Sequence, residues 1–216
     1  MIYLILLSAL FLRLINLNQS FWLDEAINVL AVRENSLSQL VTQYALGDFH
    51  PPLYHVVLFF WTRLFGFSEV ATRMFSVTFG VATVFLCFSL FKRIFSKFAV
   101  VLATLFLATS PLHIYYSQEA RMYAFTAFFA LLSVYFFIKI IRDGIKAQKN
   151  IWFGYFFSTL FLLYSEYLPY FLVLSQNIII FWQREQIGKK TIKKWIMTQL
   201  LLFACLLPWF PFLWRQ

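Results

Sequence analysis

The chain has 216 residues, of which 62% are hydrophobic, 22% aromatic and only 12% charged. A soluble globular domain carries about 25% charged residues, so this composition excludes an ordinary soluble protein and predicts an integral membrane protein. A mean hydropathy of +0.74 agrees, and the formal net charge of +9 is then expected to reflect membrane topology rather than nucleic-acid binding.

Seven apolar runs are predicted to form membrane-spanning helices, at residues 2–17, 70–91, 98–114, 122–140, 151–167, 168–183 and 195–213. The first run has no basic residue before it and no cleavage site after it, so it is predicted to be a retained helix rather than a signal peptide. One further run, 53–65, is ambiguous. Its 13 residues make about 20 Å of helix, against about 30 Å of hydrocarbon core.

The basic residues decide where the ambiguous run lies. If it does not cross, the segments 92–97, 139–150 and 184–194 share one side and carry 12 of the 18 basic residues, including every lysine. Because basic residues concentrate in cytoplasmic loops, we predict an interfacial or re-entrant helix at 53–65 and a cytoplasmic N-terminus. The basic run 188–195 is then an anchor on anionic lipid headgroups, and no nucleic-acid partner is expected. The predicted fold class is an all-α integral membrane protein of about seven transmembrane helices, formed as one module over residues 1–216.

The predicted external loop, 18–69, begins with NQSFWLDEAINVLAV, whose apolar residues recur at helical spacing along one face. Asp24 and Glu25 occupy the first turn of this amphipathic helix. One carboxylate there compensates the helix dipole, worth about 0.3–1 kcal/mol, but a second one in an apolar frame beside Trp22 costs desolvation free energy. We therefore interpret the acidic pair as a functional candidate, with dipole compensation as the structural alternative.

Two more polar clusters fall on the same predicted side. In GDFHPPLYH, prolines hold His50 extended; Asp48 and His50 either face a site or cap the next helix, and His55 is interpreted as a packed or interfacial histidine. In HIYYSQEARMYAF, Arg121 lies at an external helix start, against the lysine bias, and needs a local anion.

That anion is either Glu119 or a phosphate, which suits the planar fork of arginine. Tyr123 lies in the same stretch, Arg73 raises the same question at the start of run 70–91, and Glu166 adds a carboxylate at membrane depth, where such residues are functional candidates.

Cofactor signals are sparse. The sequence has no Walker loop, GxGxxG, CxxC or HExxH motif, and its three histidines are scattered, so no histidine-based metal site is expected. A carboxylate–histidine site formed from Asp24, Asp48 and His50 is left open, with a divalent cation as the cofactor considered. Cys87 and Cys205 both lie inside apolar runs and are interpreted as small buried hydrophobic residues.

Four motifs occur in the order FWLDEA, HPPLYH, RLFG with ATRMFS, and YYSQEARMYA. With these motifs the chain resembles the polyprenyl-phosphate-sugar-dependent glycosyltransferases of the GT-C superfamily, in particular the protein-mannosyltransferase and aminoarabinose-transferase-like group (glycosyltransferase family 39 and relatives). The likeness runs over essentially the whole chain. It implies transfer of a sugar from a polyprenyl-phosphate-linked donor to a protein, lipid or glycan acceptor on the outer face of the cell membrane.

The resemblance also implies roles for residues. Asp24 corresponds to the family's catalytic base, with Glu25 in support. The HPPL stretch places His50 beside a juxtamembrane helix, Arg73 corresponds to the family arginine at the following helix start, and Arg121 lies where a lipid phosphate would be contacted. The expected partners are the lipid-linked donor, the bilayer and an unidentified acceptor. The candidate substrate-binding residues are Asp48, His50, Arg73, Glu119, Arg121, Tyr123 and Glu166.

Three alternatives remain. Relatives generally continue beyond this length, so the chain is also read as a catalytically incomplete fragment lacking acceptor-recognition parts. A transporter or flippase for lipid-linked sugars has similar composition, but it predicts polar residues at mid-membrane depth, broken helices and repeats. A non-catalytic membrane scaffold leaves Asp24, His50 and Arg121 without a common role. The ionisable residues collect on one predicted face and no internal repeat is visible, which favours the enzyme.

Overall fold

The computed structural model describes residues 1–215, and every regular element within them is a helix, which confirms the all-α prediction. The N-terminal half contains α1 (Ile2–Leu14), α2 (Leu23–Glu34), α3 (Leu37–Gln39), η1 (Leu40–Tyr44), α4 (Ala45–Gly47), α5 (Leu53–Phe65), α6 (Glu69–Phe91), α7 (Lys97–Thr109) and α8 (Pro111–Ser117). The C-terminal half contains α9 (Tyr123–Asp143), η2 (Gly144–Lys146), α10 (Lys149–Leu163), α11 (Tyr170–Trp182), α12 (Arg184–Ile187), α13 (Lys189–Leu206), η3 (Leu207–Trp209) and α14 (Phe210–Leu213).

Each predicted span contains a helix, but the count of seven crossings is not confirmed. By length and composition three helices in the described chain are long enough to cross a membrane: α6, α9 and the helix from Lys189 to Leu213. A fourth forms if α7 and α8, bent by 54° at their junction, count as one span. The prediction exceeded this number because apolar runs continue past helix ends, as at Ile15, where the backbone is extended and α1 stops after 13 residues.

The bend between α7 and α8 has a local cause. Pro111 is the first residue of α8, where its missing N–H breaks no helical bond but its ring prevents α7 from continuing through it. Ser110 caps the new helix by accepting a hydrogen bond from the His113 backbone N–H at 3.4 Å. The bend carries the chain from α7 into the 118–122 loop, which lies beside α2.

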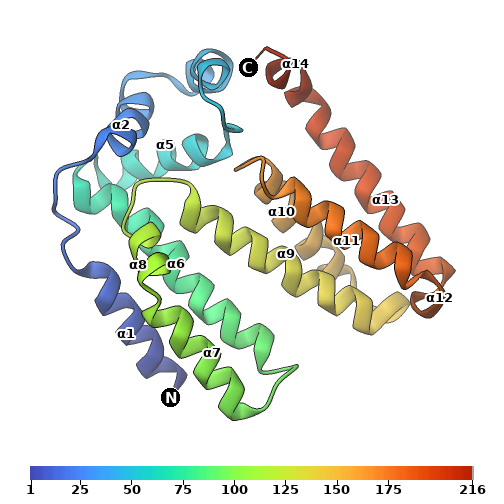
Figure 1. Cartoon of the computed structure of the whole chain (residues 1–216). Coiled ribbons are helices and arrows are strands. Elements are labelled where there is room, and N and C mark those ends of the chain that lie inside the picture. Colours follow the sequence, from blue (N-terminus) through green and yellow to red (C-terminus); the bar gives the residue numbers. More distant parts are fainter. Residues whose placement is uncertain (216) are drawn as a thin grey trace.

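The lysine-bearing connections share one end of the helix bundle. In Figure 1 the α6–α7 turn, the α9–α10 turn and α12 lie at the ends of the helices away from α2 and α5. The 118–122 loop and the start of α6 lie at the α2 end. This arrangement agrees with the grouping of the lysines on one side; which end faces the cytoplasm stays a prediction.

Helix α5 has the predicted bounds, Leu53–Phe65. It packs against α2 and α6, and Figure 1 shows it running across the end of the bundle rather than along α6. Its buried side chains join an aromatic cluster with Phe75 of α6 and Phe125 of α9, whose rings stack at 5.8 Å. The cluster meets the polar residues at Tyr54, whose ring centre lies 5.3 Å from that of His55.

A buried arginine fixes α1 to α8. Arg13 is fully buried; its Nη1 donates to the backbone oxygens of Ala9 and Ala108 at 2.9 and 3.0 Å, and its Nε to Ser117 Oγ at 3.2 Å. Gly80 of α6 makes room for this contact, because a Cβ there would lie 2.2 Å from Ser117 Oγ. Arg13 thereby holds the end of α8, from which the 118–122 loop departs.

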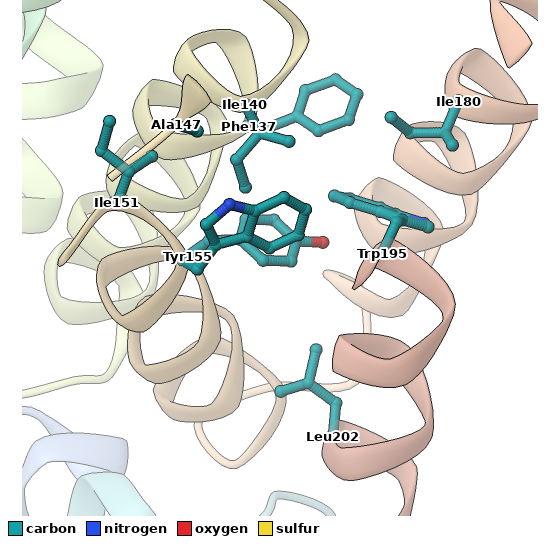
Figure 2. Packing of buried hydrophobic residues seen from close by; sticks show 9 residues of the cluster. Phe137, Ile140, Ala147, Ile151, Tyr155, Ile180, Trp195 and Leu202 are labelled. Atoms are coloured by element: carbon teal, nitrogen blue, oxygen red, sulfur yellow. The ribbon is translucent and has the colours of Figure 1, made fainter. Parts of the chain in front are cut away.

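The C-terminal half has its own apolar cluster. Figure 2 shows Tyr155 of α10 and Trp195 of α13 facing each other, with Phe137 of α9 beside them. The Tyr155 and Trp195 rings lie 4.8 Å apart, and those of Phe137 and Trp195 5.5 Å apart. Helices α9 and α10 approach closely at Gly154, where an added Cβ would meet the Phe136 ring at 2.2 Å.

Candidate functional site

Helix α2 presents three polar side chains to the 118–122 loop. Asp24 and Glu25 lie in its first turn, and Asn28 follows one turn later, so the three share a face. Glu25 and Asn28 are buried, whereas the Asp24 side chain is 38% exposed. The two adjacent carboxylates are therefore in different environments, one inside the protein and one at an open edge.

Glu25 forms a buried ion pair with Arg73. Arg73 Nε donates to Glu25 Oε1 at 2.9 Å and Nη2 donates to Oε2 at 2.5 Å, a bidentate arrangement. The remaining Arg73 donors bond the backbone oxygens of Leu17, Gln19 and Ser20. The Arg73 guanidinium thus fixes the α1–α2 connection to α6 and has its donors engaged within the protein.

The backbone of Ala120 is held by α2 on both sides. Its N–H donates to Glu25 Oε1 at 2.7 Å, and its carbonyl oxygen accepts from Asn28 Nδ2 at 3.1 Å. Ala120 itself is fully buried. This clamp fixes the positions of the two charged neighbours, Glu119 and Arg121, relative to α2.

Arg121 faces Asp24. Its Nη2 lies 3.7 Å from Asp24 Oδ2, and its guanidinium carbon lies 5.6 Å from the centre of the Tyr123 ring. Burial acts to lower the pKa of Arg121, but a hydrogen bond to Tyr123 and the charge of Asp24 outweigh it, so the pKa is raised. Its buried Nε has no hydrogen-bond partner among residues 1–215. A largely buried cation with an unused donor beside an accessible carboxylate is suited to an anionic ligand.

Glu119 lies on another side of the clamp. It lines a cavity of about 670 Å³ between α1 and α8, and Arg121 is not among the residues that line it. Burial, together with the negative charges of Glu25 and Asp24, raises the pKa of Glu119, against the opposing effect of a hydrogen bond from Tyr115. Glu119 Oε2 is buried and has no partner within the described chain. It is a free acceptor for a hydroxyl or amine donor.

A second group of polar side chains joins the segment after α4 to the α10–α11 connection. Asp48 Oδ1 lies 3.1 Å from His50 Nδ1, and His50 Nε2 lies 3.9 Å from Glu166 Oε2. His55 Nδ1 lies 3.7 Å from Asp48 Oδ2, and His55 Nε2 is 3.0 Å from Asn28 Oδ1. Through Asn28, this group is connected to the Ala120 clamp.

The ionisation of this second group follows from burial and pairing. Burial acts to raise the pKa of Asp48, but the hydrogen bond from His50 and the charges of His55, His50 and Arg121 outweigh it, so this pKa is lowered. Burial lowers the pKa of His55 to about 4, even though Asp48 opposes the shift. His55 is therefore neutral near pH 7 and acts as a hydrogen-bonding spacer between Asp48 and Asn28.

The structure brings the sequence candidates into three linked groups. Asp24, Arg121 and Tyr123 form one; Asp48, His50 and Glu166 form the second; the paired Glu25 and Arg73 form the third with Glu119, since all three line the cavity. The positive charge of Arg121 helps to lower the pKa of Asp48, so the first group is electrostatically coupled to the second. The predicted residues thus come together from α2, α6, α9 and three connections.

Sequence reasoning missed Asn28 and gave His55 only a packing role. Asn28 is three residues after Glu25, so helical spacing places it on the acidic face of α2, and this was the available signal. His55 is buried as the sequence indicated, but it also contacts Asp48 and Asn28. Within residues 1–215, no three His, Cys, Asp or Glu side chains are placed to hold a metal ion, and the Asp24–Asp48–His50 site that the sequence left open is not formed among them.

One comparison with known proteins is informative. A family model described as dolichyl-phosphate-mannose-protein mannosyltransferase matches residues 49–212, well over half of the chain. The matched range includes His50, Arg73, Glu119, Arg121 and Glu166 but begins after Asp24. A search of curated proteins found no match.

Proposed function

The chain belongs to the dolichyl-phosphate-mannose-protein mannosyltransferase family, whose members are membrane glycosyltransferases of the GT-C type, and we propose that it transfers a sugar from a polyprenyl-phosphate-linked donor with Asp24 as the catalytic base. The observation that carries the proposal is the pairing of an accessible carboxylate with an incompletely bonded cation. Asp24 Oδ2 and Arg121 Nη2 form an ion pair 3.7 Å apart, which brings the proposed base and the proposed phosphate-binding cation to one edge of the protein; the pair has to open for the sugar and the acceptor to enter between them.

Inverting transfer exchanges one bond for another at the anomeric carbon. The acceptor hydroxyl loses its proton to Asp24 as its oxygen forms a bond to that carbon, and the bond from the carbon to the donor phosphate oxygen breaks. Negative charge then grows on the departing lipid phosphate. The 38% exposure of the Asp24 side chain leaves room for an acceptor, whereas the buried Glu25 cannot meet one without breaking its pair with Arg73.

Arg121 is proposed to bind the lipid phosphate. A guanidinium with an unused Nε offers charge-assisted hydrogen bonds that strengthen as charge develops on the leaving group. Tyr123 keeps the guanidinium in place through its hydrogen bond and its ring. Because Arg73 is already saturated by Glu25 and three backbone oxygens, we assign it to positioning; of the two anions left open from sequence, a carboxylate or a phosphate, it pairs with the carboxylate.

The remaining candidates are proposed to contact the sugar or the acceptor. Asp48, His50 and Glu166 offer carboxylate and imidazole groups with side-chain exposures of 19, 24 and 16%, suitable for sugar hydroxyls at an open edge. Glu119 offers its free oxygen to a hydroxyl entering from the α1–α8 cavity. The site is proposed to face outward, because the lysine-bearing connections lie at the other end of the bundle.

The test is a transfer assay on membranes or purified protein, using a panel of polyprenyl-phosphate sugars with and without divalent cations. Release of polyprenyl phosphate and appearance of the sugar on an acceptor are both measured. Asp24→Asn is expected to reduce transfer by about 10²–10⁴-fold while leaving insertion and helix content unchanged. The matched control is Glu34→Gln, which neutralises an exposed carboxylate at the other end of α2.

Glu34→Gln is expected to retain the wild-type rate. Transfer that survives Asp24→Asn within a few-fold would remove Asp24 from the role of base. Movement of a lipid-linked sugar across vesicle membranes, with no transfer to any acceptor in the panel, would instead support the flippase alternative.

A further inference from the structure

A second cavity lies at the lysine-bearing end of the molecule, far along the bundle from Asp24. It has a volume of about 390 Å³ and lies between α10 and α13. Its floor is Trp152, its walls are aromatic and aliphatic, and Lys149 and Lys194 stand at its edge. Figure 1 places the starts of α10 and α13 at the end of the bundle opposite α2 and α5.

The floor of this cavity carries an unused hydrogen-bond donor. Trp152 is 6% exposed, and its indole Nε1 is buried with no partner among residues 1–215. Buried indole N–H groups normally find an acceptor, so this one indicates a ligand atom that accepts a hydrogen bond. The requirement is independent of the charges at the cavity edge.

The edge is positive and lacks a neutralising carboxylate. Both lysines are exposed, no acidic residue lines the cavity, and Lys194 Nζ lies over the Trp152 ring at 4.6 Å from its centre. Two lysines and a tryptophan with an unpartnered indole N–H therefore line one otherwise largely apolar groove. A phosphate group, which is anionic and rich in acceptors, satisfies all three.

The walls call for a hydrocarbon chain next to that phosphate. Phe153 and Phe157 are 61 and 49% exposed and stack at 6.4 Å between ring centres, and Leu201 of α13 faces them across the groove. Inorganic phosphate has no apolar part that could cover these exposed rings. A polyprenyl-phosphate donor is also a poor occupant, because its phosphate must react near Asp24 at the opposite end of the bundle.

We propose that the α10–α13 cavity is a binding site for an anionic phospholipid of the bilayer, with its phosphate on Lys149, Lys194 and Trp152 Nε1 and an acyl chain along Phe153 and Phe157. Basic pockets between membrane helices on the cytoplasmic side bind anionic headgroups in this way. A lipid bound there would hold the N-terminal ends of α10 and α13 together. The choice of a phospholipid over a polyprenyl phosphate rests on the proposed transfer near Asp24, whereas the match of the lysines and the indole N–H to a phosphate does not.

Native mass spectrometry of the purified full chain in detergent tests the proposal. Phosphatidylglycerol is titrated against phosphatidylcholine of the same acyl composition, and apparent dissociation constants are compared. The wild type is expected to retain phosphatidylglycerol selectively. Lys149→Gln with Lys194→Gln is expected to weaken that binding roughly thirtyfold, about fivefold for each lysine removed. Trp152→Phe keeps a ring and loses the N–H, and is expected to weaken it a few-fold.

The control is Lys189→Gln with Lys193→Gln, which removes the same charge from α13 without touching the cavity lining. This variant is expected to bind phosphatidylglycerol as the wild type does. Equal weakening in the control and in the cavity variant overturns the proposal, because binding would then follow net charge. Equal binding of the two phospholipids by the wild type, or preferential retention of a polyprenyl phosphate in a lysine-dependent manner, also overturns it.

Discussion

Between α2, α5 and the 118–122 loop most polar side chains are charged and several of their buried atoms lack partners, whereas five neutral side chains between α9, α10, α11 and α13 are bonded to one another. In the first region Glu119 Oε2, Arg121 Nε and Tyr54 Oη are buried without partners in the described chain. In the second, Thr159, Ser133, Gln176, Tyr155 and Gln199 form a continuous hydrogen-bonded chain, with successive distances of 2.9, 3.2, 2.8 and 3.1 Å.

We interpret this difference as a division of roles: the neutral network holds helices together, and the charged region is available to bind a ligand. A closed network of hydroxyls and amides holds apolar helices together without carrying charge through them. Charged atoms left open at one end of the bundle carry a desolvation cost that only a ligand recovers. A transporter would need ionisable groups along the helices at mid-depth, and the C-terminal network offers neutral groups instead.

The largest effect is expected from opening the buried pair beneath the site. Glu25→Gln leaves the Arg73 guanidinium buried and uncompensated, which typically costs about 3–5 kcal/mol of unfolding free energy. Denaturant unfolding in detergent measures the loss. The double variant Glu25→Gln with Arg73→Gln is expected to lose less than the sum of the single variants. A loss below about 1 kcal/mol in Glu25→Gln would contradict the pair's structural role.

A smaller effect is expected on donor binding from Arg121→Lys. Lysine keeps the charge but loses the planar fork, so the KM for the lipid-linked donor is expected to rise about tenfold to a hundredfold, with little change in unfolding free energy. Steady-state kinetics with the donor varied provide the measurement. Arg33→Lys, on the exposed last turn of α2, is the matched control and is expected to leave KM unchanged.

His55 makes stability depend on pH. Its pKa is about 4 in the folded state and 6.5 ordinarily, so the unfolded chain binds a proton first as the pH falls. The stability is full above pH 6.5 and is lost progressively down to about pH 4, by about 3 kcal/mol for this shift in pKa. In His55→Gln the temperature of thermal unfolding, measured from pH 7.5 to pH 4, is expected to depend less steeply on pH than in the wild type. An equally steep profile in that variant would place the titration elsewhere.

The neutral network should give the smallest change. Gln176→Leu removes the hydrogen bonds to Tyr155 and Ser133. The leucine still fills the space between α10 and α9 with a side chain of similar size. Interhelical hydrogen bonds in membranes contribute about 0.6 kcal/mol on average and about 1.7 kcal/mol at most. The substitution is therefore expected to lower the unfolding free energy by an amount in this range. The transfer rate of the folded fraction is expected to remain that of the wild type. A large loss of rate would contradict the division between the two regions.

Much of the arrangement followed from local sequence signals. Helix α5 has the predicted bounds because Pro52 precedes it and Gly66 ends it with φ of 92°, and both residues are visible in the sequence. The helical spacing of the apolar residues around Asp24 and Glu25 predicted the helix α2. The number of spans was harder to predict, because hydropathy does not show that α1 ends at Leu14 or that α8 bends away from α7.

The division of labour between neighbouring residues was not predictable. Asp24 and Glu25 are chemically similar and adjacent, yet only Glu25 turns toward Arg73, 48 residues away. Likewise Glu119 and Arg121 diverge because Ala120 is clamped by α2, a contact that spans 95 residues. Such roles depend on tertiary contacts between segments distant in the chain. These contacts cannot be predicted from composition or from the spacing of residues.

Donor binding and transfer measured together in Asp24→Asn test the central claim most directly. We expect this variant to bind a polyprenyl-phosphate sugar as tightly as the wild type or more tightly, since a negative charge beside Arg121 is removed, while transfer is lost. Transfer at the wild-type rate would contradict the assignment of Asp24 as the base. Loss of donor binding together with transfer would show that Asp24 builds the site rather than acting on the acceptor.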